Sequence, residues 1–162
     1  MRQHNIRLKR GRIGLIADTH GLLRPEALAA LKNSQLIIHA GDIGKLAVIE
    51  ELNRVAPVLA IRGNNDREAW AKRIPDVLNL HVNGIKLQVI HNVHEIAADP
   101  RTAGFDAVIS GHSHKPGVSK SDEVLYVNPG SAGPRRFKLP IAVGMIYISG
   151  NKLRASITEL QI

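Results

Sequence analysis

The first half of the chain alternates nearly continuous apolar runs with amphipathic stretches, and this alternation is what most restricts its fold. The apolar runs cover residues 12–18, 35–42 and 57–66. Such runs suit parallel strands that are covered on both faces and joined by helical crossovers. The first half is therefore predicted to be α/β, with helices over 25–33 and 45–55.

The second half has a β-rich pattern. Two runs flank Asn83-Gly84 and two more flank Gly150-Asn151, which are dipeptides typical of tight turns. One short helix is expected within 94–104. No linker or repeat divides the chain, so we predict a single domain over residues 12–162. Its expected architecture is a four-layer α/β/β/α sandwich, in which two mixed β-sheets pack face to face with helices outside.

The composition favours a cationic protein without disulfides. The formal net charge is +8, which attracts phosphate-bearing partners or substrates. Part of this excess lies in residues 1–11, which we interpret as a solvated basic arm. The chain has no cysteine, so no thiolate can bind a metal, and a reducing, cytoplasmic setting is expected. No segment is apolar over enough residues to span a bilayer, so no membrane partner is expected.

Polar side chains that can bind metal ions stand at the ends of five predicted strands. Because ligand sites form beyond the carboxyl ends of strands, we expect these side chains to converge. One such residue alone usually caps a helix or closes a turn, but several imidazoles gathered at one edge are favourable around cations. The predicted metal ligands are Asp18, His20, Asp42, Asn64, His91, His112 and His114.

The donor set indicates the ions and the reaction. Imidazole, carboxylate and amide donors without sulfur suit Mn, Ni, Fe, Co or Zn, and manganese is our first expectation. Seven side chains suit two divalent ions that share a bridging carboxylate. Such ions bring four positive charges against two negative ones from Asp18 and Asp42, so an anionic substrate is expected. A metal-bridging hydroxide would hydrolyse a phosphate ester, and Ser113 and Ser131 are interpreted as structural.

The motifs "DTH", "GD", "GNND" and "GHSH" follow one another in this order. With them, the chain resembles the calcineurin-like metallophosphoesterases over about residues 12–135, and particularly the small single-domain phosphodiesterases of prokaryotes. The resemblance implies that Asp42 bridges two ions. It implies one ion held by Asp18, His20, Asp42 and His114, and another held by Asp42, Asn64, His91 and His112.

Two positions depart from the family pattern. Asn65 stands where many family phosphatases have a histidine that protonates the leaving group, and an amide cannot act as a general acid. We therefore expect Asn65 to hydrogen-bond the substrate phosphate in a catalytic site with Asp42 and His91. Asn92 replaces a glycine of the family's "HGH", which leaves His94 as an alternative to His91.

Several further residues have two interpretations. His39 is a hydrogen-bonded core imidazole or a support for a ligand, and Asp66 orients a ligand or begins a helix. Arg135 and Arg136 are either solvated or in contact with substrate phosphate.

Two other functions stay open beside a phosphodiesterase. One is a metal-binding scaffold for protein contacts, as in the retromer subunit that shares this fold. The other is a hydrolase that acts on nucleic acid, which the basic charge suggests and the low aromatic content of 3% opposes. The oligomeric state also stays open, a homo-oligomer included.

Overall fold

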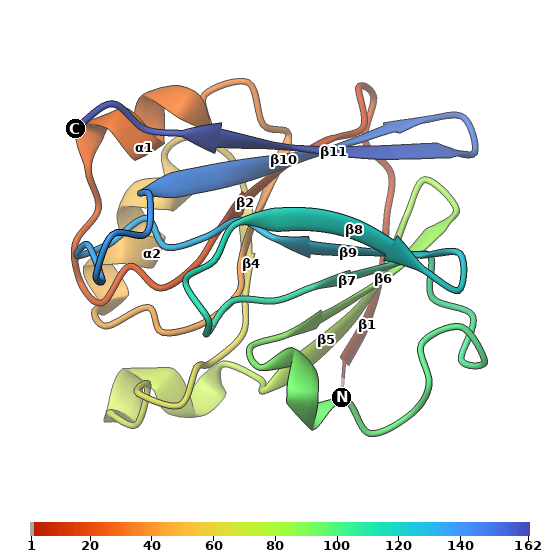
Figure 1. Ribbon diagram of the computed structural model, residues 1–162, viewed down its shortest axis with the longest axis horizontal. Helices are drawn as coiled ribbons and strands as arrows, with labels where there is room; N and C mark the ends of the chain where they lie inside the picture. The colour runs from red at the N-terminus through yellow and green to blue at the C-terminus, as the bar shows by residue number, and fades with distance from the viewer. Residues whose placement is uncertain (1) are drawn as a thin grey trace.

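Two mixed β-sheets form the body of the protein in the computed structural model, which describes residues 2–162, with side chains from residue 4 onwards (Figure 1). The five-stranded sheet has the order β11-β10-β2-β3-β4. Its strands are β2 (Arg12–Ile16), β3 (Leu36–His39), β4 (Val58–Ala60), β10 (Ala142–Ser149) and β11 (Lys152–Glu159). The six-stranded sheet has the order β1-β5-β6-β7-β9-β8. Its strands are β1 (Arg2–Ile6), β5 (Val77–Val82), β6 (Ile85–Ile90), β7 (Ala107–Ile109), β8 (Gly117–Ser121) and β9 (Val124–Asn128).

The alternating first half folds as its pattern predicts. Strands β2, β3 and β4 are parallel neighbours, and they are connected by α1 (Pro25–Ala30) and α2 (Leu46–Asn53). Pro25 begins α1, where a missing backbone N–H costs no hydrogen bond. Both helices, drawn in orange in Figure 1, pack on the outer face of the five-stranded sheet through Leu31 and Leu52.

The main core lies between the two sheets. Alternate side chains of each strand point inward, so that Leu15 and Ile38 of one sheet share a cluster with Leu80 and Leu87 of the other. All four of these side chains are fully buried. Because the two sheets pack along their inner faces, the loops of one sheet lie next to those of the other at each end of the sandwich.

The outer face of the six-stranded sheet has a thinner cover than the other. The expected helix within 94–104 is reduced to a 3-10 turn, η2 (Val93–Glu95). Val93 and Ile96 pack on a small cluster that contains Ile90 and Val108. The α/β class and the two mixed sheets are confirmed, while this fourth layer consists of a turn and a loop. A second 3-10 turn, η1 (Ala69–Arg73), follows β4 in the chain.

Both predicted hairpins are present. Strands β5 and β6 pair antiparallel around Asn83 and Gly84, and β10 and β11 pair antiparallel around Gly150 and Asn151. Sequence reasoning missed β8, whose five residues are all exposed. An edge strand without buried side chains has no apolar alternation to reveal it.

Within residues 1–11, which we interpret as a solvated arm, Arg2–Ile6 form strand β1, Arg7, Lys9 and Arg10 are exposed, and Met1 lies outside the described residues. Strand β1 pairs parallel with β5. The Leu8 amide donates to Asn83 Oδ1 at 2.8 Å, and the Ile148 amide donates to the Gly11 carbonyl at 2.8 Å. A sheet edge satisfies the backbone of a polar segment as well as that of an apolar one, which is why composition did not predict this strand.

No helix in the described part of the chain is both long and apolar enough to cross a membrane.

Candidate metal centre

The seven predicted ligands all lie on loops that follow β2, β3, β4, β6 or β7 at one end of the sandwich. Backbone hydrogen bonds hold these loops together. The Asp18 amide donates to the Gly41 carbonyl, and the His20 amide donates to the Asp42 carbonyl, each at 3.0 Å. The two sheets are joined at the same place, because the His112 amide donates to Asp18 Oδ2 at 3.1 Å.

Five of the seven residues have left-handed backbone conformations. Their φ angles are positive at Asp18 (54°), His20 (47°), Asp42 (56°), His112 (70°) and His114 (63°). Side chains other than glycine rarely adopt this region, and such residues cluster at functional sites because the surroundings must hold them there. The loops are therefore shaped to turn these side chains toward one another.

Asp18, Asp42 and His91 form the innermost group. His91 Nε2 lies 3.3 Å from Asp42 Oδ2 and 3.8 Å from Asp18 Oδ1. His91 Nδ1 lies 2.7 Å from the Ala40 carbonyl, to which it can only donate. The other ring nitrogen, Nε2, points into the site, where it can bind a cation once it carries no proton.

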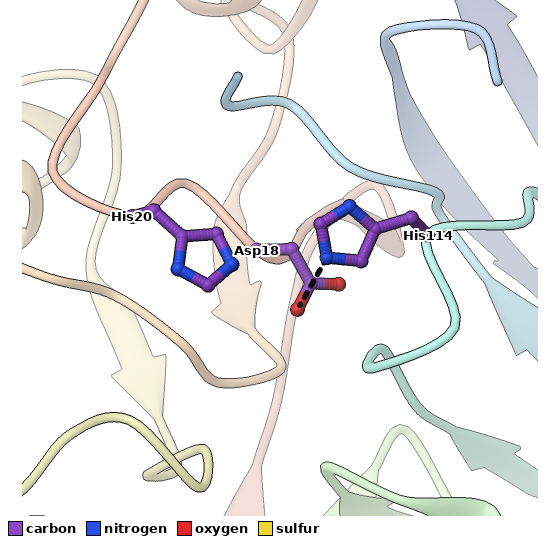
Figure 2. A group of neighbouring side chains, drawn as sticks. All are labelled: Asp18, His20 and His114. Atoms are coloured by element: carbon purple, nitrogen blue, oxygen red, sulfur yellow. Dashed lines mark ion pairs between the residues drawn. The ribbon is translucent and has the colours of Figure 1, made fainter. Parts of the chain in front are cut away.

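His20 and His114 also lie near these carboxylates, and Figure 2 shows them on either side of Asp18. His114 Nε2 lies 3.7 Å from Asp18 Oδ1, and His20 Nε2 lies 3.7 Å from Asp42 Oδ2. The rings of His20 and His114 are stacked with centroids 5.6 Å apart. Figure 2 shows both imidazoles directed at the Asp18 side chain between them.

Unsatisfied polar atoms gather in this group. Six buried side-chain nitrogen and oxygen atoms of the described residues have no hydrogen-bond partner, and four of them belong to the predicted ligands. These four are Asp18 Oδ1, His20 Nε2, His91 Nε2 and His114 Nδ1. Burying such atoms without partners is costly, and cations would satisfy them. The residues present therefore fit divalent metal ions.

Two groups of ligand atoms are compact enough for an ion. Asp18, His20 and His114 form one, and Asp18, Asp42 and His91 form the other, with all ligand atoms of each group within 4.8 Å of one another. Asp18 belongs to both groups, whereas the family resemblance assigns the bridge to Asp42. The two carboxylates thus lie together between the groups of imidazoles.

Asn64 and His112 complete the set from the solvent side. With five further residues they line a cavity of about 70 Å³: His20, Asp42, Asn65, His114 and Arg136. His112 also meets His91 edge to face, with ring centroids 5.2 Å apart. The structure thus brings all seven predicted ligands to one place.

The two carboxylates have opposite pKa shifts. Burial raises the pKa of Asp18 to about 7. Burial also acts to raise the pKa of Asp42, but the imidazole of His91 and the Asn65 amide outweigh it and lower that pKa to about 2. Without cations one carboxyl of the pair holds a proton near neutral pH, and positive charge between the two would favour ionisation of both.

The buried imidazoles also differ. Burial, followed by the positive charge of Arg136, lowers the pKa of His114 to about 4. Burial alone would lower the pKa of His91, but the Asp42 carboxylate, the Ala40 carbonyl and the charge of Asp18 raise it. His114 is therefore neutral at pH 7, with a lone pair available to a cation.

Asp66 acts as a support for the ligand loops and does not begin a helix. Its carboxylate accepts the amides of Ile43 (3.0 Å), Gly44 (3.0 Å) and Gly63 (2.9 Å). Ile43 and Gly44 directly follow Asp42 in the chain, and Gly63 directly precedes Asn64. The side chain is 4% exposed, so the loss of its three hydrogen bonds would release both loops together.

His39 supports the same loops from the core. Its Nδ1 accepts the Gly41 amide at 3.1 Å, which leaves Nε2 as the donor to Thr19 Oγ1 at 3.0 Å. Thr19 then donates to the Ile43 carbonyl at 2.8 Å. The ring is fully buried, and burial lowers its pKa to about 3. Both interpretations of His39 hold together, because a core imidazole positions the chain between Asp18 and His20.

The remaining candidates take clear places. His91 lies in the centre, while His94 is an exposed residue of η2, whose backbone amide donates to Asn92 Oδ1 at 3.1 Å. Asn65 donates its backbone amide to Asp42 Oδ1 at 2.9 Å and its side chain to Asp42 Oδ2 at 3.3 Å. Arg136 lines the ligand cavity, and no motif distinguished it from Arg135.

Comparison with known proteins shows the family of the chain. Residues 12–151 match the family model described as the calcineurin-like phosphoesterase superfamily domain, and the chain belongs to this family. It is 32% identical to a protein of Methanothermobacter thermautotrophicus named "Probable metallophosphoesterase", over 90% of each chain. It is 31% identical to a phosphodiesterase of Methanocaldococcus jannaschii, over 74% of this chain and 82% of that one.

Solved structures show the same fold. A structure titled "Structural and Functional Characterization of a Novel Archaeal Phosphodiesterase" has a TM-score of 0.74 and 28% identity, over 91% of this chain and 99% of the other. Vps29 of Entamoeba histolytica, in a structure titled as complexed with zinc, has a TM-score of 0.71 over 91% of this chain and 98% of its own. Its identity is 18%, so this second likeness concerns the fold alone.

Proposed function

We propose that this protein is a two-metal phosphodiesterase. The observation that carries the proposal is the cluster of buried, unsatisfied ligand atoms at the end of the sandwich. Asp18, His20, Asp42 and His114 would hold one ion, and Asp42, Asn64, His91 and His112 the other. When bound, two divalent ions lower the pKa of a water between them and so supply hydroxide for attack on phosphorus. Manganese is the first candidate, followed by nickel, iron, cobalt and zinc, and a cytoplasmic setting belongs to the proposal.

The shape around the ligand cavity favours a diester. A hollow of about 440 Å³ adjoins it through Asn64 and His112, and another of about 370 Å³ adjoins it through His20 and His114. A phosphodiester has an organic group on each side of its phosphate, and each hollow can take one. A monoester would fill one hollow and leave the other to water.

Asn65 sharpens this preference. Its side chain lines the ligand cavity, where it can donate a hydrogen bond to a phosphate oxygen, and it has no proton to give to a leaving alkoxide. Activated aryl diesters need no such proton, because aryloxides are good leaving groups.

Replacement of Asn65 by histidine tests this role. In Asn65→His we expect turnover of an alkyl monoester to rise by about 100-fold, because general acid catalysis is restored, while an aryl diester gains little. The ratio of kcat/KM for the two substrates is the measurement. Asn65→Gln is the matched control, since it keeps an amide. An unchanged ratio in Asn65→His would show that Asn65 has a different role.

The function itself is tested by metal reconstitution. The protein is freed of metal with a chelator, and Mn, Ni, Zn or Mg is added back singly while bis(p-nitrophenyl) phosphate and p-nitrophenyl phosphate are followed. We expect turnover of the diester with at least one ion. Thermal unfolding of the same samples reports binding separately, because an ion at 100 times its Kd stabilises the fold by about 2.7 kcal/mol. Binding without turnover would favour the scaffold instead.

A nucleic-acid substrate cannot be tested by truncating the basic N-terminal segment. Deletion of residues 1–11 would remove strand β1 from its sheet. Arg7→Gln with Lys9→Gln removes two exposed charges and leaves the backbone pairing in place. A salt-dependent affinity for DNA or RNA that falls in this variant would support the nucleic-acid hydrolase.

A further inference from the structure

A short loop, residues 134–138, forms one wall of the ligand cavity. With His20 and His114 it lines the open hollow of about 370 Å³ through Pro134, Arg135, Arg136 and Phe137. Arg136 also lines the smaller ligand cavity, so it stands at the boundary between the two. A ligand bound at the metal centre and extending into this hollow would lie beside Arg136, His20 and His114, which line both.

The base of this loop is fixed against the metal-binding loops. A Cβ atom on Gly133 would overlap the carbonyl oxygens of Asp18 and Thr19, so glycine alone permits this approach. Arg24 Nη2 donates to the Gly133 carbonyl at 3.3 Å from the start of α1. The loop therefore has a defined position relative to Asp18.

The far side of the loop closes on itself. The Leu139 amide donates to the Arg136 carbonyl at 3.1 Å, and Arg135 Nη1 donates to the Leu139 carbonyl at 3.2 Å. The guanidinium of Arg135 is thus occupied within the loop. Within the described part of the chain, the guanidinium of Arg136 has no hydrogen bond or ion pair, although Arg136 lines the same cavity as Asp42.

Phe137 is unusual in two respects. Its side chain is 88% exposed, the largest value among the exposed large hydrophobic residues of the described chain. Its φ of 53° lies in the left-handed region, where an aromatic residue is strained. An exposed ring next to an unpaired guanidinium and a phosphate site provides a flat apolar surface for another ring.

We propose that Arg136 and Phe137 recognise a phosphate ester with a planar aromatic group, and specifically a nucleotide. Arg136 binds the phosphate at the mouth of the ligand cavity, and Phe137 stacks on the base in the adjoining hollow. This substrate class rests on the proposed phosphoesterase function. It requires no base-specific hydrogen bonds, because stacking is tolerant of base identity.

The test compares adenosine 5′-monophosphate with ribose 5-phosphate, which has the same phosphate and sugar without the base. Their affinities are measured by titration calorimetry on Mn²⁺-saturated protein. In wild type, we expect the nucleotide to bind at least tenfold more tightly. In Phe137→Ala, we expect about a tenfold loss for the nucleotide and less than a twofold change for ribose 5-phosphate. In Arg136→Gln, both ligands should lose about tenfold or more.

Two exposed residues that line neither cavity serve as matched controls. Lys138→Gln removes a neighbouring charge that does not line either cavity, and Val118→Ala removes an exposed apolar side chain on β8. Neither should change either affinity by more than twofold. Phe137→Trp should keep or increase the affinity for the nucleotide, which confirms stacking as the cause.

Turnover of bis(p-nitrophenyl) phosphate in the same samples separates this inference from the proposed function. Equal affinities of wild type for the two ligands, or equal losses for both in Phe137→Ala, would overturn the inference even in an active enzyme. A selective loss for the nucleotide without any turnover would support the inference and overturn the proposed function.

Discussion

The two ends of the sandwich are built from the same sheets and yet differ in chemistry. At one end, five ligand residues have a left-handed φ, and four of them, His20, Asp42, His112 and His114, line a shared cavity. At the other end, left-handed φ angles occur in tight turns, at Asn83, Gly84 and Gly150. The same local conformation therefore turns the chain at one end and aims side chains at the other.

The larger hollow is at the turn end. It has a volume of about 590 Å³ between the β8–β9 and β10–β11 hairpins, whose turns lie at the right of Figure 1. None of the buried side-chain atoms that lack a hydrogen-bond partner in the described part of the chain belongs to a residue that lines it. Arg154 lies over the Tyr147 ring at 4.2 Å, and Asp106 accepts the Lys86 amide at 2.8 Å. At the metal end the cavity is small, but its buried polar atoms lack partners. Unsatisfied atoms are thus a better guide to a site than volume.

The largest expected effect comes from a pair of variants, each of which removes one carboxylate at one end of the sandwich. Asp42→Ala should lower kcat/KM for an aryl diester by about 1,000-fold or more, because it removes the ligand that the proposed function assigns to both ions. Asp106→Ala, which removes an exposed carboxylate at the turn end, should leave kcat/KM within twofold. Metal content measured on the purified variants accompanies the kinetics. Comparable losses in both variants would show that the metal end is not the catalytic one.

A glycine pair tests how closely the metal end is packed. Gly133→Ala should destabilise the protein by about 3 kcal/mol, because the added Cβ overlaps backbone atoms of the Asp18 loop. Gly117→Ala on β8 places its Cβ in open space and should change the free energy of unfolding by less than about 0.5 kcal/mol. Urea unfolding measures both. Equal free energies of unfolding for the two variants would mean that the Asp18 loop can move away from the added Cβ without loss of stability.

The smallest effect concerns His39 beneath the metal loops. Since burial holds its pKa near 3, the folded state stays neutral while the unfolded state gains a proton as the pH falls through 6.5. In metal-free protein this site should lose about 2 kcal/mol of stability between pH 7 and pH 5. His39→Gln has no such loss. The difference in the free energy of unfolding between wild type and His39→Gln should therefore shrink by about 2 kcal/mol from pH 7 to pH 5. A difference independent of pH would contradict the buried neutral imidazole.

Much of the metal end could be predicted from the sequence, and the reason is geometric. Asp18 and Asp42 each follow an apolar strand of the parallel β2–β3 pair, and the carboxyl ends of such strands meet at one edge of a sheet. His91 also follows an apolar strand, in the sheet packed against this one. The family motifs then strengthened an expectation that strand ends already supported. The structure brings these residues together as expected, while the number and identity of the ions stay within the proposal.

What could not be predicted depends on contacts between distant segments. Strand β1 exists because β5 offers it a free edge, and its own polar residues carry no strand signal. The role of Asp66 depends on amides more than 20 positions earlier in the chain. Nothing in the sequence distinguishes Phe137 from other loop residues. Its position near the ligand loops follows only from the packing of Gly133 on the Asp18 loop.

The ligands come from both sheets, and this has a consequence for the folding of the chain. Asp18 and Asp42 follow strands of the five-stranded sheet, whereas His91 and His114 follow strands of the six-stranded sheet. An ion bound by ligands from both sheets would therefore link the sheets across one end of the main core and oppose any motion that separates them. Amide protons of β2 and β6 should exchange with deuterium more slowly once a metal ion is bound, whichever ion it is.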